Sequence, residues 1–340
     1  MVPEIDGLSL QAQTAYAELI ERLISHAADG RPASVVAKTI RGKTYYYLQQ
    51  RGPLGAKQTY LGPASDALAA RIADMERAWS HARASAEGRE ELVATLRAAR
   101  VAVPTAAEAK ILAAISDAGV FRAGAVLVGT HAFACLGNLL GVRWTGLSMR
   151  TGDIDLAQDS VVSLAITGEI APSDLGSLVR DATTGVSLWP IPGFDRHAPS
   201  TSFRIHGSDL RVDIVTPLRG RPRGPIRLPM LGVSATPLRF LDYLLEETIP
   251  AAVVGGAGVL VNVPTAARFC LHKLIVARER PAHERAKAAK DLAQAGALID
   301  VLREDRPADL RKAWRALVSR GGGWQKRAER SLREIAQTIP

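Results

Sequence analysis

The sequence predicts an α+β fold, in which a small mixed β-sheet is flanked by helices. An N-terminal helix/β-hairpin region precedes this core, and a C-terminal helical domain follows it. Short runs of β-branched and apolar residues concentrate between residues 124 and 235. Apolar residues at helical spacing occupy most of the sequence before that stretch, and after residue 264 the pattern is helical apart from the glycines 321–323. We therefore expect domains at 1–104, 105–235 and 236–340.

Length and composition indicate a folded protein. The 340 residues fit two or three domains, and a hydrophobic content of 47% excludes wholesale disorder. Two cysteines, Cys135 and Cys270, exclude a disulfide framework and favour a reduced, cytoplasmic compartment. The first ten residues lack the basic and apolar regions of a signal peptide.

The N-terminal region begins with helical spacing of apolar residues over 8–29. Residues 35–63 then alternate β-branched and aromatic runs with glycine breaks, which predicts a two- or three-stranded antiparallel piece. Lysine, arginine and tyrosine interleave there, so the piece fits either a nucleic-acid contact or a small sheet with a solvated face. Two helices are expected next, over 64–101 and 105–118.

The central region has mixed α/β character. Twenty uncharged residues lie between Arg122 and Arg143, about enough to span a bilayer, but polar and glycine residues in the middle favour a strand, a glycine turn and a helix. We therefore expect no membrane span. Strands are expected at 125–129, 153–157, 185–191, 201–207, 210–217 and 258–264, with a helical segment around 173–182 and a basic loop at 219–225.

Charge is concentrated near the C-terminus. The chain has 43 Lys+Arg and 34 Asp+Glu, a net charge of +9. Residues 268–340 contain 17 of the basic and 9 of the acidic residues, and so contribute +8. This favours an acidic partner such as nucleic acid or a nucleotide, although a solvated helical bundle explains the charge equally well.

Acidic residues on two predicted strands are the candidate metal ligands. Asp153 and Asp155 flank one isoleucine, so on a strand both side chains project from the same face. Two carboxylates this close repel each other unless a proton or a cation intervenes, and Mg²⁺ prefers such oxygen ligands. Asp213 stands alone among apolar neighbours; it either completes a three-acid metal site or pairs with Arg211 or Arg204.

A glycine turn precedes these acids in the sequence. Residues 126–128 are apolar, and Gly129 and Thr130 follow at the expected start of a helix. Gly129 allows the backbone to approach a ligand closely, and Thr130 with the helix N-terminus offers donors to a phosphate. His131 could contact a substrate, or cap the helix or pack in the core.

These residues together resemble the nucleotidyltransferase superfamily typified by DNA polymerase beta. The matching elements are Gly129-Thr130, Asp153-Ile-Asp155 and Asp213. Within it, the chain is most similar to bacterial AbiEii-like nucleotidyltransferases, which include toxins of toxin–antitoxin pairs. That similarity covers roughly residues 120–304 and adds the elements Arg150-Thr151, Lys273 on a C-terminal helix, and Lys290-Asp291-Leu.

The resemblance implies a two-metal site for Mg²⁺, or Mn²⁺, held by Asp153, Asp155 and Asp213, with Asp213 also able to accept the proton. It further implies that Lys273 neutralises charge on the triphosphate. The nucleotide-binding residues implied are Gly129, Thr130, Arg150, Lys273 and Asp291.

Structural roles remain open as alternatives for three of these side chains. Lys273 could extend along an amphipathic helix into solvent, and Arg150 could pair with a nearby acid. Asp291 could position Lys273 or a water, or lie on a solvated helix face.

The expected activity is transfer of a nucleoside monophosphate from an NTP such as ATP to an acceptor hydroxyl. The resemblance makes an RNA, the 3′ end of tRNA, the leading acceptor, in a toxin that could have an antitoxin partner. AMP transfer to a protein hydroxyl and a non-catalytic nucleic-acid-binding module are the alternatives. The sequence lacks GxxxxGK[ST], GxGxxG and HExxH motifs, which argues against P-loop, dinucleotide-binding and zinc-hydrolase classes.

Overall fold

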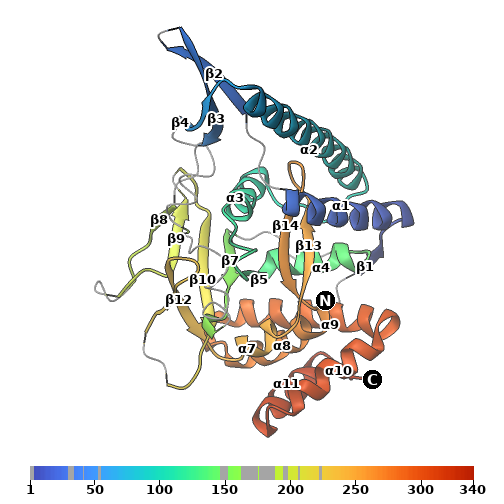
Figure 1. The fold of residues 1–340 in the computed structure, drawn as a ribbon. Helices are drawn as coiled ribbons and strands as arrows, with labels where there is room; N and C mark the ends of the chain where they lie inside the picture. Colours follow the sequence, from blue (N-terminus) through green and yellow to red (C-terminus); the bar gives the residue numbers. More distant parts are fainter. Residues whose placement is uncertain are drawn as a thin grey trace.

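The computed structural model shows a central sheet with helices packed against it and a smaller sheet at the far end of a long helix (Figure 1). This arrangement confirms the predicted α+β class. The residues described are 4–29, 34–40, 42–52, 55–145, 152–161, 175, 188–193, 198–205, 207–221 and 224–340.

The N-terminal region pairs two helices and carries the small sheet. α1 (Leu10–Asp29) packs beside α2 (Asp66–Ala98). The antiparallel sheet has the order β2-β3-β4 and confirms the predicted strands between 35 and 63. Its strands are β2 (Ser34–Ile40), β3 (Lys43–Gly52) and β4 (Gly55–Pro63).

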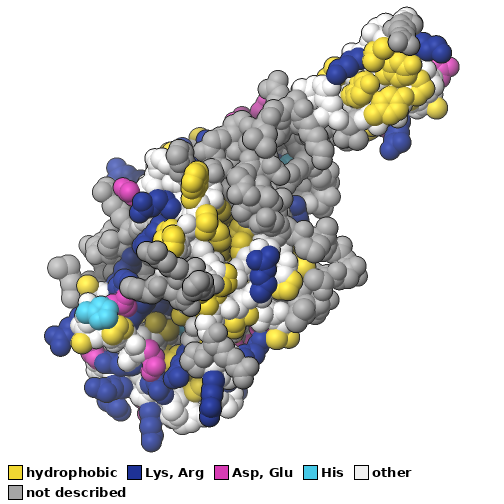
Figure 2. Space-filling view, turned by 90° about the vertical axis from the view of Figure 1, so that its left-hand side faces the viewer, with side chains coloured by type: hydrophobic (Ala, Val, Ile, Leu, Met, Phe, Trp, Pro, Cys, Tyr) yellow, Lys and Arg dark blue, Asp and Glu magenta, His cyan; other side chains and the backbone are white. Residues whose placement is uncertain are grey.

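One face of that sheet gathers aromatic rings. Tyr60 lies beside both Tyr45 and Tyr47, with ring centroids 6.2 and 5.5 Å apart, and Lys38 lies over the Tyr47 ring. Hydrophobic side chains of this sheet are visible as the patch at the top of Figure 2, with basic side chains beside it. Tyr45, Tyr47 and Tyr60 therefore share a face of the sheet.

The central sheet has the order β11-β12-β10-β7-β5, and β8 and β9 extend it along one edge of β10. β10 runs parallel to β7 and to β12, whereas β5 and β9 run antiparallel to their partners. The strands are β5 (Val126–Val128), β7 (Asp153–Ala157), β8 (Leu188–Pro190), β9 (Ser202–Ile205), β10 (Arg211–Pro217), β11 (Ile226–Leu228) and β12 (Val233–Leu238).

Two helices frame the start of this sheet. α3 (Ala106–Asp117) begins with a capping box, in which Thr105 and Glu108 satisfy each other's backbone N–H groups. α4 (Gly129–Leu139) follows β5 directly. The predicted strand at 125–129 is one residue too long at this end, because Gly129 already belongs to the helix. Among the described residues, no helix is both long enough and apolar enough to cross a membrane.

Several strands were not predicted from the sequence. β1 (Glu4–Gly7) pairs with β6 (Val142–Thr145), although more than a hundred residues separate them. β13 (Thr248–Val253) forms a hairpin with the predicted strand β14 (Val259–Pro264). The helical segment expected around 173–182 lies outside the described residues except at Leu175.

The C-terminal part is helical, as predicted, and shares its core with the sheet. One hydrophobic cluster runs from Ile111 of α3 through Ile154 of β7 to Leu274 and Leu332 of the C-terminal helices. The elements are α7 (Leu241–Leu245), α8 (Ala266–Glu279), the short helix η1 (Ala282–Glu284), α9 (Arg285–Asp305), α10 (Pro307–Val318) and α11 (Gly322–Glu334). Continuous packing therefore fixes these helices against the edge of the sheet.

Candidate active site

Two of the predicted acids lie side by side on neighbouring strands. Asp155 of β7 and Asp213 of β10 are register partners in a parallel pair, which puts both side chains on the same face of the sheet. Neither makes a hydrogen bond or an ion pair to another described residue. Among the described residues, the pairing therefore leaves two adjacent carboxylates with no hydrogen-bonded or ion-paired partner.

The surroundings of Asp155 make its negative charge costly. Burial raises the pKa of Asp155 to about 6, and the charges of Asp213 and Asp153 add to this effect. Lys273 and Arg280 act in the opposite direction, but they do not offset it. A cation bound here would relieve the repulsion between these carboxylates.

Asp153 is engaged differently from the other two acids. Its Oδ1 accepts hydrogen bonds from Nε and Nη2 of Arg211, at 2.9 and 2.8 Å. The alternative that Arg211 pairs with Asp213 is therefore wrong, because this guanidinium bonds Asp153 instead. Arg211 is well exposed, so the pair lies at the open edge of the site.

The turn after β5 brings the backbone close to Asp155. Gly129 has φ +67°, and a Cβ at this position would collide with Oδ2 of Asp155. Only glycine satisfies both the conformation and the space. The first turn of α4 therefore begins directly beside the acid, where its N–H groups can meet a phosphate.

Thr130, the next residue, is buried and contacts a lysine from a distant helix. Lys290 of α9 donates a hydrogen bond to Thr130 Oγ1 at 3.1 Å. Burial lowers the pKa of Lys290, and the nearby positive charge of Lys273 lowers it further. Lys290 was not predicted as a site residue, since its only signal in the sequence is its place beside Asp291.

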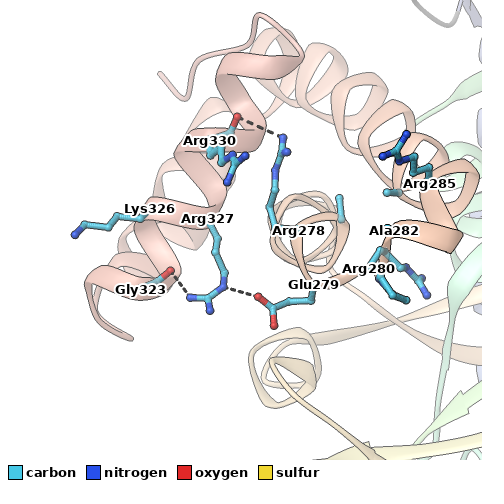
Figure 3. A pocket seen from close by; sticks show the side chains of 12 residues that line it. Arg278, Glu279, Arg280, Ala282, Arg285, Gly323, Lys326, Arg327 and Arg330 are labelled. Carbon is cyan, nitrogen blue, oxygen red and sulfur yellow. Dashed lines mark hydrogen bonds and ion pairs between the residues drawn. The ribbon is translucent and has the colours of Figure 1, made fainter.

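Lys273 and Asp291 form a buried ion pair behind the turn. The Lys273 ammonium lies 2.5 Å from Asp291 Oδ1, and Nε of Arg280 lies 3.1 Å from the other carboxylate oxygen. Asp291 is only 3% exposed, so the solvated-face alternative for it is wrong, and Lys273 does not extend into solvent. Figure 3 shows Arg280 just beyond the end of α8.

A pocket of about 340 Å³ opens beside these residues. Gly129, Asp155, Lys273 and Arg280 are among the residues that contribute polar groups to its lining. Its apolar lining comes from the sheet, α7 and α8, namely Val128, Val215, Leu238, Phe240, Leu241, Leu244, Phe269 and Val276. A pocket lined by both charged and apolar side chains suits a nucleotide, which has a phosphate chain and a flat base.

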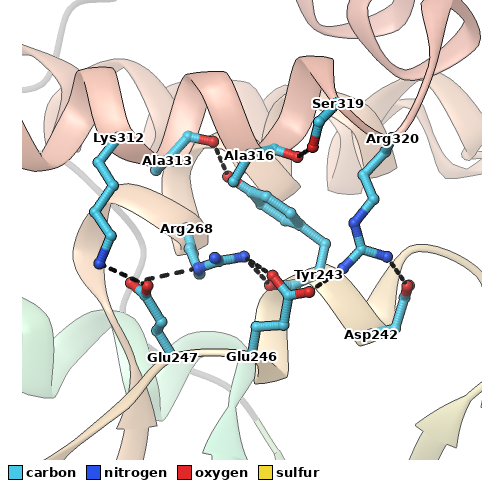
Figure 4. A network of polar contacts seen from close by, with 10 residues as sticks. All are labelled: Asp242, Tyr243, Glu246, Glu247, Arg268, Lys312, Ala313, Ala316, Ser319 and Arg320. Atoms are coloured by element: carbon cyan, nitrogen blue, oxygen red, sulfur yellow. Dashed lines mark hydrogen bonds and ion pairs between the residues drawn. The ribbon is translucent and has the colours of Figure 1, made fainter.

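A polar network fixes the elements that line the apolar part (Figure 4). Arg268 of α8 is buried, and its Nη1 donates to the Tyr243 carbonyl oxygen at 2.9 Å and to the Glu246 carboxylate. The Tyr243 hydroxyl donates to the carbonyl oxygen of Ala313 in α10 at 2.9 Å, and Arg320 binds Asp242. These contacts tie α7, α8 and α10 together beneath the pocket.

Two histidines near the site are neutral. His131 is buried with its Nε2 3.7 Å from Glu108, and burial lowers its pKa, with the charge of Lys290 lowering it further. Burial also lowers the pKa of His272 to about 3. His131 thus lies in the interior, as its core alternative expects, whereas His272 lines the pocket as an uncharged side chain.

The donor set at the acids fits a divalent cation in part. Asp155 and Asp213 offer adjacent hard oxygen donors whose repulsion a cation would relieve. Within the described ranges, however, no three His, Cys, Asp or Glu side chains stand together as a group that could hold a metal ion. Asp153 would have to exchange its contact with Arg211 before it joined the other two acids. Arg150, predicted to bind the nucleotide, lies outside the described residues.

One comparison with known proteins gives a match to this chain. A family model described as nucleotidyltransferase matches residues 106–319, which is more than half of the chain and includes the acids, the glycine turn and Lys273. The chain belongs to this nucleotidyltransferase family, and so it is a transferase that uses a nucleotide substrate. No curated protein and no solved structure matches the chain.

Proposed function

We propose that the protein transfers a nucleoside monophosphate from an NTP to the hydroxyl of an RNA, in a Mg²⁺-dependent reaction. The observation that carries this proposal is the adjacency of Asp155 and Asp213, with Asp155 beside the Gly129 turn and in the lining of the pocket. In the reaction, the acceptor oxygen bonds to the α-phosphorus, the bond to the bridging oxygen breaks, and pyrophosphate leaves.

The chain's own residues would bind and orient the substrates. The N–H groups at the start of α4 and the hydroxyl of Thr130 would hold phosphate oxygens. Lys290 and Lys273 lie close enough to Asp155 for their positive charges to interact with its carboxylate. Both would neutralise negative charge on the triphosphate. Asp213 would accept the proton of the attacking hydroxyl at its carboxylate.

The metal would be held by Asp155 and Asp213, and by Asp153 once it is freed from Arg211. Mg²⁺ bound there would lower the pKa of the attacking hydroxyl and stabilise negative charge on the phosphates. Burial, together with the negative charges of Asp213 and Asp153, raises the pKa of Asp155, and this supports the assignment of a cation here.

The acceptor is inferred from the charge of the C-terminal helices and from the family resemblance. The +8 charge of residues 268–340 supports a polyanionic acceptor, and the resemblance to AbiEii-like proteins favours the 3′ end of tRNA and a role as a toxin. That narrower resemblance rests on Arg150-Thr151, on Lys273 and on Lys290-Asp291-Leu. Lys273 pairs with Asp291, and Lys290 donates a hydrogen bond to Thr130.

Incubation with labelled NTPs, Mg²⁺ and total tRNA tests the proposal directly. We expect labelled RNA with the wild-type protein and none with Asp213→Asn, provided that circular dichroism shows both to be folded. Asp209→Asn, in the loop just before β10, is the matched control and should label RNA normally. Labelling of a polypeptide instead would move the acceptor to protein, and incorporation that survives Asp213→Asn would refute the site.

A further inference from the structure

A second cavity lies next to the candidate active site, and it is lined mainly by cations. It has a volume of about 620 Å³ and lies between the end of α8, the start of α9 and α11 (Figure 3). We call it the basic groove; its charged lining residues are Arg278, Glu279, Arg280, Arg285, Lys326, Arg327 and Arg330. Six cations therefore face a single acid.

Half of these cations are already neutralised inside the protein. Arg327 binds Glu279 at 2.6 Å, so the one acid of the groove is occupied. Arg278 bonds Ser331 and Glu334. Arg280 bonds Asp291 and Glu284 at the edge of the groove. These pairs hold the walls in place.

The other three cations have no partner among the described residues. Arg285, Lys326 and Arg330 are all exposed, and they come from the first turn of α9 and from α11. Lys326 and Arg330 are four residues apart, so they lie on the same face of α11. Like charges held this close repel each other, and a chain of negative groups would relieve that repulsion.

The groove is continuous with the candidate active site. Glu279, Arg280 and Pro281 line both the groove and the nucleotide pocket. The end of α8 is therefore the shared wall between them. A nucleic-acid strand bound in the groove would end beside the acids of β7 and β10.

We propose that the basic groove binds the phosphate backbone of the acceptor RNA next to its reactive end. This inference rests on the proposed function, whose substrate it places. None of the described residues that line the groove is aromatic, so none offers a ring on which a base could stack. Binding through the groove is therefore electrostatic, independent of base sequence and strongly dependent on salt. The basic surface at the bottom of Figure 2, where the C-terminal helices lie, agrees with this charge.

Fluorescence anisotropy with a labelled single-stranded RNA tests the inference on the full chain, without NTP or metal. We expect Lys326→Glu/Arg330→Glu to weaken RNA affinity by roughly tenfold or more, and to reduce the slope of log affinity against log salt by roughly 1.4, since each phosphate contact on a single strand contributes about 0.7. Oligo-A and oligo-U should bind with equal affinity to the wild type.

The control variant is Arg311→Glu/Arg315→Glu. It makes the same charge change at the same spacing, on an exposed face of α10 away from the groove. We expect it to weaken RNA binding by less than about threefold, because it changes only the overall electrostatic potential of the protein and no side chain of the groove. Equal melting temperatures for the two variants would show that neither effect comes from unfolding.

Three outcomes would overturn the inference: equal weakening by both variants, no RNA binding by the wild type, or tighter binding of DNA than of RNA of the same sequence. The proposed function fails separately. If only the groove variant loses RNA binding, and the wild type labels no RNA with any NTP, the groove is supported as an RNA-binding site. The proposed transfer of a nucleotide to RNA is then refuted.

Discussion

Asp155 and Asp213 occupy the same register position on two parallel strands, 58 residues apart in sequence, and neither is neutralised by another described side chain. Asp155 is also partly buried, so water stabilises its charge less well than it would at the surface, and its pKa is raised. A stable protein retains such an arrangement where a ligand compensates it. The predictions below follow from this pair and from the residues around it.

The first prediction concerns the pH dependence of stability. The pKa of Asp155 is about 6 in the folded protein against 3.8 ordinarily, so the folded state binds this proton more tightly than the unfolded state. Its contribution to stability therefore falls as pH rises from about 4 to about 6, and stays low above that. Ionising Asp155 costs about 3 kcal/mol at pH 7, since one pKa unit is about 1.4 kcal/mol.

Asp155→Asn removes this cost, and it should raise the free energy of unfolding at pH 7 but not at pH 4, in urea titrations with a chelator present. Asp159→Asn is the control of opposite sign. Burial would raise the pKa of Asp159, but hydrogen bonds from Arg219 and Val161 outweigh it and hold the pKa down, so this variant should lose stability at pH 7. Millimolar Mg²⁺ should diminish the gain from Asp155→Asn; an unchanged gain would argue against a cation at this acid.

The second prediction concerns the glycine turn. Gly129→Ala should abolish activity and destabilise the protein, because the added Cβ meets Asp155 and the residue keeps a positive φ. Gly256→Ala is the matched control, since it has a φ of +58° with open space around it. It should lose about 1–2 kcal/mol from the backbone conformation alone. Equal destabilisation of the two variants would mean that the approach of Asp155 to the turn is not close.

Much of this site could be predicted from the sequence because the relevant information is local. The spacing of Asp153 and Asp155 fixes a shared strand face, and Gly129 marks a turn between an apolar run and a helix. The antiparallel sheet at 35–63 and the C-terminal helices were also predictable from short-range patterns. Each of these features depends on residues close together in the chain.

The rest depends on contacts between distant segments. β1 and β6 are short strands that form by pairing with each other across a large sequence separation. Neither therefore has a strong strand pattern in its own sequence. In the sequence Lys290 is marked only by its place in Lys290-Asp291-Leu, but the packing of α9 brings it to Thr130. The choice of Arg211 between Asp153 and Asp213 likewise depends on side-chain geometry that spacing does not determine.

The third prediction concerns the buried ion pair. Asp291→Asn keeps the shape of the side chain but leaves Lys273 and Arg280 without their shared carboxylate. Loss of one partner from a buried pair costs about 3–5 kcal/mol, which urea denaturation would measure. Asp300→Asn, on the same helix, loses one hydrogen bond from Gln337 and should cost about 1 kcal/mol. Similar losses in the two variants would show that Asp291 does not organise the cations.

The last prediction concerns Lys290, which the structure adds to the site. Lys290→Met removes the positive charge beside Thr130 and keeps most of the side-chain volume, so we expect the KM for the NTP to rise roughly tenfold with a smaller change in kcat. Lys290→Arg should restore part of the affinity, since it keeps the charge. Lys287→Met is the matched control, because Lys287 lies one turn earlier on α9, is exposed and binds only Glu284 among the described residues. Steady-state kinetics of NTP consumption would separate these variants. If Lys287→Met raised KM as much as Lys290→Met, the general charge of α9 would explain the effect; a unique effect of Lys290 would place the triphosphate at the Gly129–Thr130 turn.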